Sequence, residues 1–190
     1  MNDINEYDIS KIDLSDLKDF IHTHGSVRIF KKNEYLLYQD SPCRFIGLID
    51  QGMCRFTHTN SSGTERIVGF SLTGHLVSDY TACLCHRPAL VSIQAITECR
   101  VIIIPYSELE NFWNSTAEHQ LLGRKVAEQL FVMTYRRLIE SYCCSPEERY
   151  QEFMTHYPNL KEHLPLKEIA SYIGVTPETV SKIRKKILGR

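Results

Sequence analysis

A short polar and basic segment near the end of the chain has the residue types that read DNA. In a helix over residues 176 to 188, a rotation of about 100° per residue places Glu178 and Lys182 on one exposed face. Glutamate accepts a hydrogen bond from the amino group of cytosine, and lysine donates to the acceptors of guanine. We therefore predict base contacts for these two residues. The rest of the predicted DNA-binding set adds polar side chains and phosphate-binding cations: Thr176, Thr179, Ser181, Arg184, Lys185 and Lys186.

Two helices joined by a tight turn are expected to position this face. Gly174 suits the turn, Thr176 suits the N-cap of the second helix, and Pro177 suits its first position. The apolar residues recur at helical spacing and should face the interior: Ile169, Ala170, Ile173, Val175, Val180, Ile183 and Ile187. This pattern predicts a helix-turn-helix. The alternative is a packing motif whose basic end merely suits the helix dipole.

The composition of the chain limits the size of a DNA-contacting surface. The chain has 190 residues, 43% of them hydrophobic, which is enough for a core and for two small domains. With 22 basic and 23 acidic side chains the net charge is −1, so a uniformly basic surface is excluded. Residues 182 to 190 hold five basic side chains, including Arg190, and no acid. Any nucleic-acid contact is therefore expected at the C-terminal segment.

The cysteines and the N-terminus indicate an intracellular protein. The seven cysteines are odd in number and follow no disulfide, zinc or iron–sulfur spacing. Residues 1 to 8 are acidic where a secretory signal would be basic, and no apolar run is long enough to span a bilayer. We therefore expect a cytoplasmic location, reduced thiols, no metal site and no membrane partner.

The middle of the chain predicts an α+β fold in which a β-roll precedes helices. After a helix in residues 14 to 21 with Ser15 as its cap, short β-rich runs alternate with turn-forming clusters. The expected strands span residues 27–30, 35–38, 45–49, 54–59, 65–70, 90–95 and 100–104. Their even spacing favours a jelly-roll-like double-stranded β-helix. We expect this domain in residues 1–114, a long helix in 115–143 and a helical domain in 144–190.

The long helix is expected to serve as a dimerisation helix. Capping-box sequences at Ser107 and Ser115 should begin a short helix and the long one, and Ser145 should cap the next. The hinge between domains is expected at residues 143–145. The apolar stripe of the long helix is wide enough to pack on its own roll and on a second copy. The predicted dimerisation residues are Leu122, Val126, Leu130 and Met133. The alternative is a helix wholly buried within one subunit.

A β-roll, a long helix and a helix-turn-helix, in this order, resemble the Crp/Fnr family of bacterial transcription regulators. Residues 31–40 (KKNEYLLYQD), 45–52 (FIGLIDQG) and 63–70 (GTERIVGF) look like the strand and turn modules of a cyclic-nucleotide-binding domain. Residues 176–182 (TPETVSK) are similar to the family's recognition helix, in which a glutamate and a basic residue four positions later read bases. Pro177 stands where the family usually has an arginine, so one contact is expected to be lost.

The resemblance implies particular partners. They are double-stranded DNA with a pseudo-palindromic site, a second copy of the chain as homodimer, and RNA polymerase. Because the sequence ends at Arg190, the hairpin wing that follows the recognition helix in many relatives is expected to be absent. No cofactor is predicted, since no cysteine precedes Cys43 where Fnr-like members bind an iron–sulfur cluster, and lone histidines are weak candidates for haem.

The resemblance also places a candidate effector pocket in the roll. Members that bind cyclic AMP carry a Gly-Glu pair and then an arginine followed by serine or threonine. The matching residues, together with nearby polar groups, are Ser78, Asp79, Arg87, Ala89, Leu90 and Gln94. A buried phosphate without its cation would be costly, so an effector other than cyclic AMP is expected.

Two other functions remain open from the sequence. One is an effector-independent DNA-binding dimer whose roll is only a scaffold. The other is a cupin-like metal enzyme, which needs closely spaced histidines and a carboxylate. His58 stands alone on its expected strand, so we predict no catalytic residue and no enzyme activity.

Overall fold

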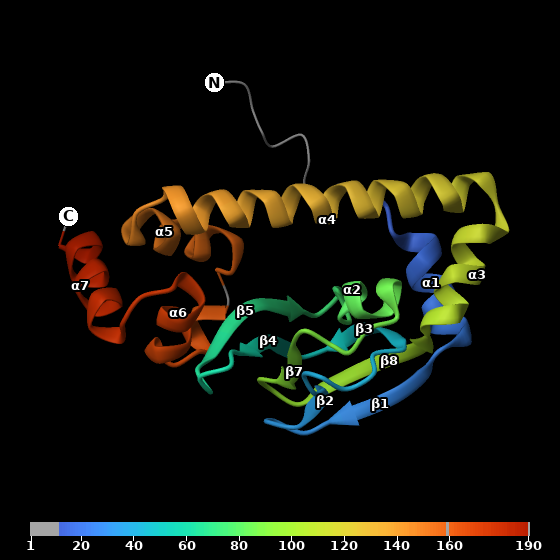
Figure 1. The fold of residues 1–190 in the computed structure, drawn as a ribbon, viewed down its shortest axis with the longest axis horizontal. Helices are drawn as coiled ribbons and strands as arrows, with labels where there is room; N and C mark the ends of the chain where they lie inside the picture. The colour runs from blue at the N-terminus through green and yellow to red at the C-terminus, as the bar shows by residue number, and fades with distance from the viewer. Residues whose placement is uncertain (1–11, 159, 190) are drawn as a thin grey trace.

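The structure, a computed structural model, describes residues 12–158 and 160–189. The acidic N-terminal lead and Arg190, which entered the sequence predictions, lie outside the described residues. Within them, eight strands form two four-stranded antiparallel sheets that make a roll (Figure 1). One sheet has the order β1 (Ser26–Phe30), β8 (Cys99–Pro105), β3 (Phe45–Gln51) and β6 (Leu76–Val77). The other has the order β2 (Tyr35–Leu37), β7 (Ser92–Ala95), β4 (Met53–Thr59) and β5 (Glu65–Leu72).

The seven expected strands are all present, and every end lies within two residues of the predicted position. The prediction missed β6 and the helix α2 (Tyr80–Cys85) that follows it. The roll's core lies between the sheets, where Ile49, Ile93 and Ile104 are fully buried. The α+β class and the roll are therefore confirmed.

Helices flank the roll and continue beyond it. They are α1 (Ser15–His24), α3 (Tyr106–Ser115), α4 (Ala117–Cys143), α5 (Pro146–His156), α6 (Leu166–Ile173) and α7 (Pro177–Leu188), with a 3₁₀ turn at Leu160–Glu162. Figure 1 shows α4 running the length of the molecule, from α3 at one end to α5 at the other. None of the helices in the described residues is both long enough and apolar enough to cross a membrane.

Some of the predicted helix N-caps are confirmed, and others are wrong by one residue. Ser145 forms the full capping box with Glu148. The long helix, however, is capped by Thr116 and not by Ser115, because the Thr116 hydroxyl accepts from the His119 amide. The box expected at Ser107 is wrong as well, since α3 already begins at Tyr106 and has no side-chain cap.

The cap expected for α1 is also wrong. Leu14 occupies the N-cap position of that helix and makes no side-chain cap hydrogen bond. Ser15 instead donates to the carboxylate of Asp13, from both its amide and its hydroxyl.

The C-terminal helices share a hydrophobic core with one sheet of the roll. Phe70 of β5 packs among the rings of Phe153, Tyr157 and Tyr172 at centroid distances of 6.2, 5.5 and 5.2 Å. The guanidinium of Arg137 on α4 lies 3.6 Å above the Tyr172 ring. The helices that follow the expected hinge are therefore docked on the roll, an arrangement that the sequence patterns did not predict.

Candidate functional site

The turn between α6 and α7 has the local geometry that its sequence predicts. Gly174 adopts φ 74°, a left-handed conformation that favours glycine, and lets the Val175 amide bond back to the Ala170 carbonyl at 3.0 Å. Thr176 is the N-cap of α7, its hydroxyl accepting from the Thr179 amide at 3.3 Å, and Pro177 occupies the first turn. The N-terminal turn of α7 is thereby fixed in direction relative to α6.

One face of α7 is buried and the other faces solvent. Val180 is fully buried and Ile183 nearly so, whereas Ile187 is 37% exposed, so the predicted buried stripe is wrong at its last position. Exposed on the opposite side are Glu178, Lys182 and Lys185. The helix therefore presents an acid in its first turn and cations further along.

Two of the predicted phosphate ligands are engaged with α5 instead of standing free. Arg184 Nε donates to the Tyr150 hydroxyl at 3.0 Å, and Lys186 Nζ lies 2.6 Å from Glu147 Oε2. Thr179 and Ser181 are half-buried. These contacts hold α7 against α5, and they leave Lys182 and Lys185 as the freely exposed cations of the predicted set among the described side chains.

Glu178 is held in its ionised form. Hydrogen bonds from its own backbone amide and from the Thr176 hydroxyl lower the pKa of Glu178, and nearby Lys182 lowers it further. An ionised carboxylate can only accept hydrogen bonds, which is the property needed to bind the amino group of cytosine.

In the roll, the side chains of Ser78 and Asp79, two of the predicted effector-pocket residues, form hydrogen bonds with the protein itself. Asp79 is buried, and its two carboxylate oxygens accept from the amides of Ala82 at 3.1 Å and Leu90 at 2.7 Å. Ser78 donates to the Phe45 carbonyl at 2.7 Å. One carboxylate thus closes the segment between β6 and β7 by capping α2 and binding Leu90.

These residues do not fit a cyclic phosphate bound in the manner that the resemblance implies. Ala89 is buried and Leu90 is 57% exposed, so no cation or hydroxyl stands at the positions of the arginine and the residue after it. Arg87 is exposed to solvent. The buried carboxylate of Asp79, already bonded to two amides, would repel a phosphate at this place.

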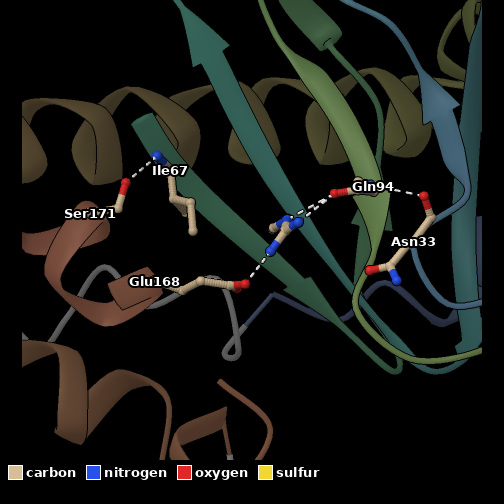
Figure 2. Close-up of polar contacts among 6 residues, drawn as sticks. Asn33, Ile67, Gln94, Glu168 and Ser171 are labelled. Carbon is tan, nitrogen blue, oxygen red and sulfur yellow. Dashed lines mark hydrogen bonds and ion pairs between the residues drawn. The ribbon is translucent and has the colours of Figure 1, made fainter. Parts of the chain in front are cut away.

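Gln94, the last predicted pocket residue, is part of a polar chain that reaches the C-terminal helices (Figure 2). Its side-chain oxygen accepts from Arg55 Nε at 3.0 Å and from Nη2 at 2.6 Å, and its amide donates to the Asn33 carbonyl at 2.8 Å. Arg55 Nη1 forms an ion pair with Glu168 of α6. Sequence reasoning missed Arg55 and Glu168, because no local spacing relates two residues 113 positions apart.

Two pairs of buried thiols also lie inside the roll. Cys43 and Cys83 have their sulfurs 3.4 Å apart, and those of Cys54 and Cys99 are 3.7 Å apart. The Cys83 thiol, donating toward Cys43, lowers the pKa of Cys43 to about 6. All seven cysteines are free. In the described part of the chain, no three His, Cys, Asp or Glu side chains gather as metal ligands would.

The exposed apolar residues of α4 include more than the predicted dimerisation residues. Leu122 packs against the roll core and Val126 is half-buried, while Leu130 and Met133 are 37% and 50% exposed. The most exposed apolar residues were not among the predicted dimerisation residues: Phe131, Tyr135, Leu138 and Tyr142. The helix is therefore not wholly buried within one subunit, and that alternative is wrong.

Comparison with known proteins agrees with this architecture. Residues 27–116, which contain the roll, match the family model of the cyclic nucleotide-binding domain. No curated protein matches the sequence significantly. At the level of sequence, the roll is therefore similar to a cyclic nucleotide-binding domain.

Solved structures extend the likeness to most of the chain. FixK2 from Bradyrhizobium japonicum superposes with a TM-score of 0.73 at 19% identity, over 87% of this chain and 85% of that one. The c-di-GMP responsive global regulator CLP from Xanthomonas campestris gives a TM-score of 0.69 at 16% identity, over 93% and 92%. The catabolite activator protein of Thermus thermophilus gives 0.58 at 17% identity, over 92% and 84%. The chain thus has the fold of Crp/Fnr-type regulators, including the C-terminal helices.

Proposed function

We propose that this protein is a homodimeric, sequence-specific DNA-binding transcription regulator of Crp/Fnr type, and not an enzyme. The observation that carries the proposal is the helix pair α6 and α7, joined by a tight turn at Gly174, with Glu178, Lys182 and Lys185 exposed on the second helix. A helix-turn-helix places the N-terminal residues of such a helix in the major groove. The overall fold, shared with several regulators, supports the same function.

In this proposal the two ends of α7 contact different parts of the DNA. Glu178 and Lys182 contact bases, Thr176, Thr179 and Ser181 lie beside them, and Lys185 contacts phosphate. Arg184 and Lys186 can contact phosphate only if they give up their partners on α5, Tyr150 and Glu147. A second copy then presents its own α7 to the next half-site, about 34 Å away on a pseudo-palindromic site.

We infer that the second copy packs along α4. Exposed apolar residues recur there at alternating steps of four and three, the spacing of a coiled-coil seam: Phe131, Tyr135, Leu138 and Tyr142. The rings of Phe131 and Tyr135 lie stacked with centroids 6.1 Å apart. The residues predicted from sequence, from Leu122 to Met133, lie on a different side of the helix and form the competing seam.

Sedimentation of two variants distinguishes the two seams. Leu138→Asp places a charge on the exposed seam and should give a monomer, because an unpaired charge is costly in an apolar interface. Met133→Asp is the matched change on the competing seam and should leave the dimer intact. The opposite result would assign the interface to Leu122, Val126, Leu130 and Met133.

The effector, if the protein has one, is not cyclic AMP in this proposal. Asp79 and the apolar pair Ala89 and Leu90 support this, because the region offers a buried carboxylate and no buried cation to a phosphate. The proposal also includes RNA polymerase as a partner of the DNA-bound dimer, on the family resemblance alone.

The test is fluorescence anisotropy on sites selected from random DNA, with and without cyclic AMP, at two salt concentrations. The double variant Glu178→Ala with Lys182→Ala should lose sequence preference and keep weak, salt-sensitive binding. The control, Lys32→Ala with Glu110→Ala, removes one exposed charge of each sign outside α7 and should bind as the wild type does. If the first double variant still selects the same site, the assigned recognition face is wrong. If the wild type selects no site, the regulator function is wrong.

A further inference from the structure

An ion pair joins the roll to the helix that precedes the predicted recognition helix. Arg55 belongs to β4, and Glu168 projects from α6 (Figure 2). Their side chains are only 20% and 14% exposed. Behind Arg55, the side-chain oxygen of Gln94 accepts two of its N–H groups, so the guanidinium is held in one orientation. A guanidinium held at two of its donors directs its remaining donors along fixed lines.

A second hydrogen bond ties the same helix to the next strand. The backbone amide of Ile67 on β5 donates to the Ser171 hydroxyl at 3.0 Å. Because Glu168 and Ser171 lie three residues apart, they share one face of α6. This face is therefore fixed to the roll at two points, through β4 and through β5 (Figure 2).

The ion pair is better suited to setting a geometry than to supplying stability. One carboxylate oxygen of Glu168, Oε2, is buried and has no hydrogen-bond partner among the described residues. The desolvation of such a pair offsets much of its Coulomb attraction. The aromatic cluster around Phe70 supplies the apolar burial that holds the domains together. Two apolar surfaces can remain in contact when one slides along the other. The ion pair, by contrast, forms only when α6 lies at one position on the roll.

The position of α6 determines the position of α7. The two helices pack through buried side chains on both sides of the turn: Ala170, Ile173, Val180 and Ile183. The roll in turn is joined to α4 through α3, where the ring of Trp113 lies within 3.0 Å of where a Cβ on Gly123 would stand. In a dimer that packs through α4, the roll, α6 and α7 form one continuous body on each side of the two-fold axis.

We propose that Arg55 is a positioning residue for DNA reading, which fixes α6 on the roll and so sets the distance between the two α7 helices of the dimer. The proposal rests on the proposed function and deepens it. The consequence is a narrow tolerance for the number of base pairs between half-sites. Loss of the ion pair lets α6 and α7 shift together, and the dimer then accepts longer and shorter spacers.

The experiment measures the affinity of the full-length protein for its selected site with the spacer one base pair longer or shorter. In Arg55→Gln the ratio of affinities for the best and the altered spacers should fall by about tenfold, while the half-site preference stays. Glu168→Gln removes the pair with little change of shape and should give the same loss. Arg55→Glu combined with Glu168→Arg restores an opposite-charge pair and should recover part of the preference. The control, Arg100→Gln, removes the ion pair between Arg100 of β8 and Asp50 of β3, which does not involve α6, and should change nothing.

Amide exchange gives a readout that does not depend on DNA. The Ile67 amide donates across the domain contact, so its exchange by NMR should accelerate at least tenfold in Glu168→Gln while amides of β8 stay protected. A wild type that selects no DNA site overturns the regulator function, and the Ile67 amide still reports whether the ion pair fixes α6. Unchanged spacer preference in both single variants overturns the positioning role. An unchanged Ile67 amide overturns the claim that the ion pair fixes α6.

Discussion

Phe70→Ala tests whether the roll and the C-terminal helices unfold as one unit. Phe70 belongs to β5 of the roll, and it is 7% exposed because rings of α5, α6 and the turn between them surround it. Its three aromatic neighbours are Phe153, Tyr157 and Tyr172. Removing the ring therefore opens a cavity between the two parts of the molecule, not inside either one.

The expected cost follows from the size of the lost side chain. Truncation of a buried phenylalanine to alanine costs about 3–5 kcal/mol, and a site beside a domain contact should lie near the lower end because neighbours partly close the cavity. For a chain of 190 residues the entropy of unfolding is about 0.4 kcal/mol per kelvin. A loss of about 3 kcal/mol should then lower the melting temperature by roughly 8 °C. Phe70→Leu, which keeps most of the volume, should cost about 1 kcal/mol.

Two probes should follow the transition in urea. Fluorescence of Trp113, on α3, reports on the roll side, and far-ultraviolet circular dichroism reports mainly on the helices. In the wild type and in Phe70→Ala the two curves should coincide, with the midpoint of both lowered in the variant. Separate transitions, or a cost below about 1 kcal/mol, would refute the shared core as a source of stability.

Three further changes address local features. Thr176→Ala should cost about 1 kcal/mol in urea unfolding, because the Thr179 amide loses its cap acceptor, whereas Thr176→Ser should be nearly neutral. Asp79→Ala leaves two amides of the roll without their acceptor and should cost about 2–3 kcal/mol by the same assay. Cys83→Ala should raise the pKa of Cys43 from about 6 toward its ordinary value, as followed by thiolate absorbance. The unfolded state keeps the Cys43 proton up to about pH 8.5, so from about pH 6 to that value the thiolate makes stability rise with pH, and Cys43→Ala should flatten this rise.

The sequence predicts the strands well because their pattern is local. Alternating apolar residues and turn clusters mark seven strands, and the turn at Gly174 follows from the residue type that adopts its φ most readily. The strand β6 was missed because its two residues are too few to show a period. The caps expected at Ser107 and Ser115 were wrong because several neighbouring residues can cap a helix, and packing of the helix on the roll selects among them.

The sequence predicted only the part of the candidate site that lies on the single helix α7. The exposed face of α7 follows from helical spacing, and Glu178 and Lys182 lie on it. The partners of Arg184 and Lys186 lie on α5, and the ion pair of Arg55 crosses between domains, so neither follows from spacing. The most exposed apolar residues of α4 were missed for a related reason: the whole helix surface is rich in apolar residues, and only the packed roll shows which side remains open.

Asp79 and the polar chain of Gln94, Arg55 and Glu168 limit how the roll could respond to a ligand. Each carboxylate oxygen of Asp79 accepts from one backbone amide, so this side chain closes the segment between β6 and β7. A small molecule that took the side chain of Gln94 would have to displace Arg55, which also holds Glu168 on α6. Occupancy at that point would then be coupled to the position of α7, and the coupling could not exceed the difference in affinity for the two positions of α6. A ligand that left this ion pair, the Ile67–Ser171 hydrogen bond and the aromatic cluster around Phe70 undisturbed would leave α6 where it is.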